Sequence, residues 1–66
     1  MDRLAELIIL INVLKDRLQS MLSNISHNFK TLTDSNIASF IEYYADYQAT
    51  QSQMLYYIKE YEALNQ

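Results

Sequence analysis

The stretch LAELIILINVLKDRLQSML, residues 4 to 22, repeats apolar side chains at steps of three and four residues. Continued to Leu32, this spacing is a heptad with two core positions. One core position holds Leu4, Ile11, Leu18, Ile25 and Leu32, and the other holds Leu7, Leu14 and Met21. Ile8, Leu22 and Phe29 widen the apolar stripe on one side. The pattern predicts a long amphipathic helix over about residues 2 to 30.

The end of this helix is its weakest part. Ser23, Asn24, Ser26 and Asn28 follow one another closely, and their side chains compete with the helix for backbone hydrogen bonds. Fraying or a kink between Ser23 and Asn28 is therefore one expectation, and a continuous helix is the other.

A turn at about residues 31 to 34 separates this helix from a second one, expected over about residues 35 to 64. Thr33 is the predicted N-cap, because Asp34 then falls in the first turn and Leu32 and Ile37 take the positions of a hydrophobic staple. The chain contains no glycine and no proline, so few connections can exist. The predicted fold is all-α: one domain, residues 1 to 66, folded as an antiparallel two-helix hairpin that a partner protein or dimerisation completes.

The second helix is expected to pair with the first through an aliphatic stripe that is interrupted by Gln48 and Gln51. Its members are Ile37, Phe40, Ile41, Tyr44, Leu55 and Ile58. More apolar surface remains on both helices than a hairpin can cover. The surplus residues are the predicted partner-binding set: Ile9, Leu10, Val13, Tyr43, Tyr47, Met54, Tyr57 and Tyr61. Tyrosine is enriched at protein interfaces, although several of these residues could instead be half-buried parts of the hairpin.

Composition excludes several classes of protein. A domain of about 60 residues buries only about 60% of its unfolded surface and usually needs further support. The chain has no cysteine, which rules out disulfides and thiolate metal sites. Its net charge is -3 and its basic residues are scattered, so neither nucleic acid nor a membrane surface is an expected partner. The apolar run Leu7 to Leu14 is too short to span a bilayer, and a cytoplasmic location is expected.

Catalytic and metal-binding residues are not predicted. His27 is the only histidine, and no carboxylate or cysteine stands at ligand spacing from it, so we expect it to be solvent-exposed. Glu42 and Asp46 form an acidic pair at a spacing of four residues, which is typical of a solvated helix face. The sequence therefore favours a non-enzymatic protein without a cofactor.

The layout of the chain resembles a known family. Its size, acidic balance and second helix, in which residues 39 to 44 (SFIEYY) precede the glutamine- and tyrosine-containing residues 48 to 57, are similar to the small co-chaperones of type III secretion needle subunits. The resemblance implies a helical hairpin that packs on a tetratricopeptide-like chaperone and helps to keep the needle subunit from polymerising in the bacterial cytoplasm. The turn differs from the expected one, since Thr33 to Asn36 contain no glycine.

Two alternatives stay open. One is a structural homodimer, in which two hairpins form a four-helix bundle, or a small regulatory hairpin. The other rests on Ser52 to Leu55 (SQML), which resembles the Ser-Gln-x-Leu-Asp signature of the helical-hairpin phosphatases that act on a sporulation response regulator. Here Tyr56 stands in place of the acidic residue that is central to that activity.

Overall fold

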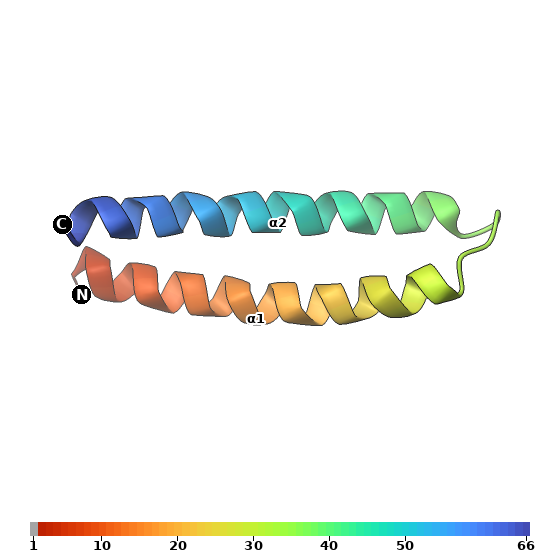
Figure 1. The fold of residues 1–66 in the computed structure, drawn as a ribbon, viewed down its shortest axis with the longest axis horizontal. Helices are drawn as coiled ribbons and strands as arrows, with labels where there is room; N and C mark the ends of the chain where they lie inside the picture. The colour runs from red at the N-terminus through yellow and green to blue at the C-terminus, as the bar shows by residue number, and fades with distance from the viewer. Residues whose placement is uncertain (1) are drawn as a thin grey trace.

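The fold is an antiparallel pair of long helices. A computed structural model describes residues 2–66 and contains α1 (Arg3–Lys30) and α2 (Ile37–Leu64), each of 28 residues. The helices lie side by side over their whole length, with the connection at one end and both termini at the other (Figure 1). The pair measures 48 × 17 × 14 Å. The predicted all-α hairpin is therefore confirmed.

Helix α1 is capped and unbroken. The carboxylate of Asp2 accepts a hydrogen bond from the Ala5 backbone N–H at 2.9 Å, which satisfies one of the free donors of the first turn. The helix continues through Ser23 to Asn28, so the fraying considered there is not found. Two contacts with α2 hold this segment: Ile25 is buried, and the Asn24 Nδ2 donates to the Tyr43 hydroxyl at 3.1 Å.

The turn differs from the prediction. Helix α2 begins at Ile37 with Asn36 as its N-cap, so the predicted N-cap at Thr33 is wrong by three residues. The Asn36 side chain explains the shift, because its amide forms hydrogen bonds to two backbone groups of the turn. Its Oδ1 accepts from the Thr33 backbone N–H at 2.8 Å, and its Nδ2 donates to the Thr31 carbonyl at 3.2 Å. Leu32 consequently lines a groove with Phe40, and the staple position predicted for Ile37 does not apply.

The two helices meet along one stripe of each, which we call the seam. Of the eight core positions predicted from the heptad, Leu7, Leu14, Leu18 and Ile25 are the buried residues of the described chain, and Leu4, Ile11, Met21 and Leu32 are half-buried. On α2 no residue is fully buried, and the half-buried positions recur at steps of three and four residues. The seam positions are Phe40, Tyr43, Tyr47, Thr50, Met54, Tyr57 and Tyr61, and Ile58 and Glu60 are half-buried beside them.

The seam of α2 is therefore mostly the tyrosine stripe and only in part the predicted aliphatic one. Phe40 lies in the seam and Ile58 at its edge, but Ile37, Ile41, Tyr44 and Leu55 are exposed. The physical reason lies in the residues that each stripe of α2 brings against the middle of α1. The aliphatic stripe would bring Gln48 and Gln51 against the middle of α1, where two amides would lose their water. The tyrosine stripe brings only Thr50 there, and the Thr50 hydroxyl donates to the Asp46 carbonyl at 2.9 Å.

An ion pair joins the terminal ends of the helices. The Arg3 guanidinium donates from Nε and Nη2 to the two carboxylate oxygens of Glu60, at 2.6 and 2.9 Å, and also contacts Glu6. This two-point geometry is specific to arginine and carboxylate. The hydrogen bonds from Arg3 lower the pKa of Glu60 below its ordinary value. The pair links the two helices at the end opposite the turn.

Leu7→Ala tests the seam. Leu7 is 0% exposed, so we expect the substitution to lower the free energy of unfolding by about 2 to 5 kcal/mol, through lost burial and an unfilled cavity. Ile9→Ala is the control, because Ile9 lies two residues away and is 51% exposed. Urea unfolding followed by circular dichroism measures both. Equal losses in the two variants would contradict the assignment of the seam.

The ion pair predicts a pH dependence. Because the pKa of Glu60 is lowered in the folded chain, its stabilisation is complete above the ordinary glutamate value of about 4.3. That stabilisation is lost as the pH falls through the lowered value. The melting temperatures of the original chain and of Glu60→Gln should therefore differ at pH 6 in low salt and converge as the pH falls below the lowered pKa of Glu60. Glu42→Gln, on the exposed side of α2, is the control. A difference that persists at the lowest pH would contradict the pairing.

Candidate interaction surface

One side of the hairpin carries most of the exposed apolar side chains. They occupy three series of positions related by seven residues: 8, 15, 22 and 29 on α1, and 37, 44, 51, 58 with 41, 48, 55, 62 on α2. We call their apolar members the apolar face. These members are Ile8, Leu22, Phe29, Ile37, Ile41, Tyr44, Leu55 and Ile58. All except Ile58, which is half-buried, are exposed.

Two grooves show that the α1 and α2 parts of this face share a side. Leu22 and Tyr44 line one groove, near the turn, and Ile8 and Ile58 line another, near the termini. Ile8 and Leu22 are fourteen residues apart, as are Tyr44 and Ile58. Two heptads return a side chain to the same edge of a paired helix. Both grooves therefore open on the same side of the hairpin.

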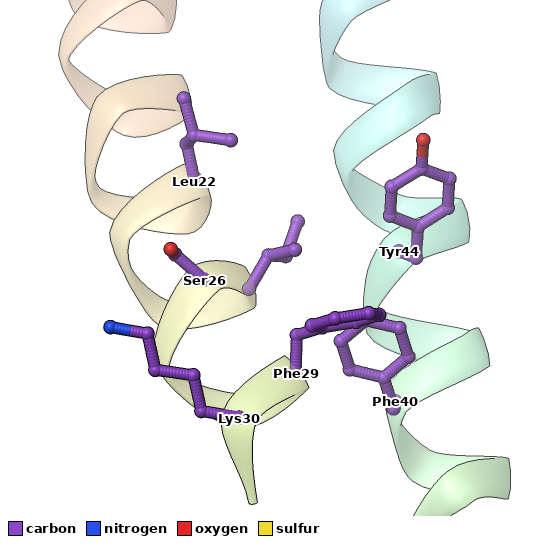
Figure 2. Close-up of a pocket in the computed structure, with 7 residues that line it drawn as sticks. Leu22, Ser26, Phe29, Lys30, Phe40 and Tyr44 are labelled. Carbon is purple, nitrogen blue, oxygen red and sulfur yellow. The ribbon is translucent and has the colours of Figure 1, made fainter. Parts of the chain in front are cut away.

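The groove near the turn is the larger and has a volume of about 520 Å³. Leu22, Ser26, Phe29 and Lys30 line it from α1, and Phe40 and Tyr44 line it from α2 (Figure 2). The Phe29 ring reaches toward α2 and lies 6.3 Å from the Phe40 ring, which lies 6.4 Å from Tyr44. Phe29 nevertheless remains 66% exposed. An aromatic wall that is this open to water offers apolar area for a further side chain to cover.

The groove near the termini is smaller, with a volume of about 240 Å³. Ile8, Ile11 and Asn12 line it from α1, and Ile58 and Tyr61 line it from α2. The Asn12 side chain is already engaged, since its Nδ2 donates to the Ile8 carbonyl at 2.9 Å. Aliphatic side chains therefore dominate this end of the face, whereas aromatic ones dominate the other.

A polar belt divides the two apolar ends. Lys15, Gln48 and Gln51 each occupy an inner position of one of the three series, and all three are exposed. Each lies within three residues of the midpoint of its 28-residue helix. The face thus reads apolar, polar, apolar from the turn to the termini.

Charge is sparse on this side of the hairpin. Of the twelve positions in the three series, only Lys15 and Glu62 carry a charge. The other charged residues of the helices, among them Asp16, Arg17 and Glu42, occupy other heptad positions. A surface region with few charges and many exposed apolar side chains has the composition of an interface centre.

The structure separates the predicted partner-binding residues into two groups. Tyr43, Tyr47, Met54, Tyr57 and Tyr61 are half-buried in the seam, so their predicted position outside it is wrong. Ile9 and Val13 are exposed and Leu10 is half-buried, on positions of α1 other than those of the apolar face. The predicted cluster of Ile9, Leu10 and Val13 with Tyr57 and Tyr61 is therefore not a single free patch. Sequence reasoning missed the exposure of Ile41 and Leu55, although the interruption of their stripe by Gln48 and Gln51 was a signal that this stripe does not form the seam.

The residues considered for chemistry lie at the surface of the hairpin. His27, Glu42 and Asp46 are all exposed. Over residues 2–66, no group of three histidine, cysteine or acidic side chains comes together in a way that could hold a metal ion. Tyr56, at the acidic position of the phosphatase-like signature, is 68% exposed and lines a shallow hollow with Ser52 and Lys59.

Comparison with known proteins gives no assignment: no protein family, characterised protein or solved structure matches this chain. Neither of the helices described between residues 2 and 66 has the length and apolar character needed to cross a bilayer.

Two tyrosines provide a matched test of the revised seam. Tyr47→Ala removes a half-buried ring, and Tyr56→Ala removes one that is 68% exposed. We expect Tyr47→Ala to lower the free energy of unfolding by about 1 to 3 kcal/mol, through the apolar area returned to water. Tyr56→Ala should change it by less than about 0.5 kcal/mol. Urea unfolding compares the two, and a larger loss for Tyr56→Ala would contradict the revised seam.

Proposed function

We propose that this chain is a non-enzymatic protein-interaction module that completes a bundle with helices of a partner protein. The observation that carries the proposal is the apolar face itself. It adds a third largely apolar heptad position to the two of the seam on α1, and a third and a fourth on α2, all on one side. Helices that meet a single neighbour need two such positions, whereas helices in the core of a bundle use three.

The energetics of the isolated chain point the same way. Within residues 2–66, four residues are buried and all of them lie on α1, which is a small core for a chain of this length. A partner that binds only the folded hairpin stabilises it by mass action. Binding over the apolar face therefore supplies the burial that the two helices alone lack.

The resemblance to type III secretion co-chaperones gives this proposal one concrete form. In that form a tetratricopeptide-like chaperone, itself built of paired helices, covers the apolar face, and the complex holds a needle subunit. The layout of the sequence supports this form. The exposed Ile41, Leu55 and Phe29 also support it, because they offer an apolar surface on which helices can pack.

Affinity purification of the tagged chain from its native host, with mass identification, tests the proposal. Two variants place a carboxylate at an exposed isoleucine: Ile41→Glu on the apolar face and Ile9→Glu outside it, where the original side chains are 61% and 51% exposed. We expect Ile41→Glu to lose the co-purifying protein, because a charge buried in the contact would lack a partner. Ile9→Glu should retain it.

The outcomes separate the candidates. Recovery of a tetratricopeptide-like protein with a small needle-type protein would support the co-chaperone form. Loss of the partner with Ile9→Glu alone would move the contact to the cluster of Ile9, Leu10 and Val13. Circular dichroism of each variant shows that the hairpin is still folded. An identical set of bound proteins in all three samples would overturn the proposal.

A further inference from the structure

We infer that the apolar face binds a second copy of this chain, so that two hairpins join face to face in a four-helix bundle. This inference rests on the proposed function and identifies the partner as a second copy of the chain. Size, symmetry and charge carry it.

The size of the face suits a stable dimer. The broad side of the hairpin measures 48 × 17 Å. Its area is on the order of 800 Å², which matches the contribution of one partner to an interface of standard size. A second hairpin of equal length covers the face from the turn to the termini. A single additional helix would leave one edge of the same face in water.

The position of the polar belt makes the face complementary to its own copy. Lys15, Gln48 and Gln51 lie at the middle of the hairpin, with apolar ends on both sides. A two-fold axis in the interface can run along the helices or across them at their midpoints. Either axis places the belt of one copy on the belt of the other, and apolar ends on apolar ends. Glutamine side chains carry both donors and acceptors, so they can pair with glutamine or with lysine across the contact.

Charge also permits self-association. Each chain has a net charge of -3, which opposes the approach of two copies through a charged surface. The three series of positions include only Lys15 and Glu62 as charged residues, and Lys30 borders them at the groove near the turn. Two copies that meet through this face keep most of their acidic residues outside the contact, where water and salt screen them.

Two lysine substitutions test the inference on the purified full chain. Gln51 lies in the belt and Gln53 outside the three series of the face, on the same helix, and both are exposed. Sedimentation velocity over a range of concentrations should give twice the 7.8 kDa chain mass for the original chain. Gln51→Lys should raise the dimer dissociation constant at least about tenfold, because either axis brings the new charge near a lysine of the other copy. Gln53→Lys should leave the constant unchanged.

Salt gives a second measurement. High salt should restore part of the dimer of Gln51→Lys, since screening weakens the repulsion between like charges. A monomer mass at every concentration would overturn the inference, and so would equal effects of the two lysines. The proposed function is tested separately by the affinity purification. It would still stand if a host protein bound the original chain and did not bind the Ile41→Glu variant. Helix content measured by circular dichroism confirms that both variants fold.

Discussion

Every feature of this structure depends on one constraint: a pair of helices can cover one stripe on each helix and no more. The stripe on α1 is aliphatic and includes the four buried residues of the described chain. The stripe on α2 is half-buried throughout. Apolar side chains outside these stripes remain in water, whatever the quality of the seam. The apolar face follows from that geometry together with a sequence that supplies a third apolar position in most heptads.

The choice of stripe on α2 shows how a few polar groups decide the packing. Two registers compete, and the aliphatic one contains the more apolar side chains at its ends. Its middle, however, would place Gln48 and Gln51 against α1. Burying an amide without a partner costs more than the extra burial of one aliphatic side chain returns. Tyrosine suits the alternative because its ring can lie in the seam while its hydroxyl reaches the edge, as Tyr43 does toward Asn24.

The same comparison explains how far the sequence predicts the structure. On α1 the leucine and isoleucine heptad has one continuous solution, so the core positions from Leu7 to Ile25 follow from spacing alone. On α2 apolar residues occupy four of seven heptad positions, so hydrophobicity alone does not show which stripe packs against α1. The polar interruptions do show it, since only the stripe through Thr50 avoids Gln48 and Gln51. The start of α2 was predicted wrongly for another reason. The hydrogen bonds from the Asn36 side chain to Thr33 and Thr31 depend on the backbone conformation of the turn, and the residues Thr33 and Asp34 do not specify that conformation.

In the proposed complex, folding and association act through different residues. Seam residues such as Leu7 and Tyr47 set the stability of the isolated hairpin, whereas Ile41 and Leu55 are exposed in it. A change in the seam would weaken folding and binding together if the partner binds only the folded hairpin. A change on the apolar face would weaken binding alone. The polar belt adds selectivity, since a partner that is apolar along its whole length would strip water from Gln48 and Gln51 without replacing their hydrogen bonds. Under the proposed function the face would favour a partner with polar groups opposite Gln48 and Gln51, and a copy of the chain meets that condition by symmetry.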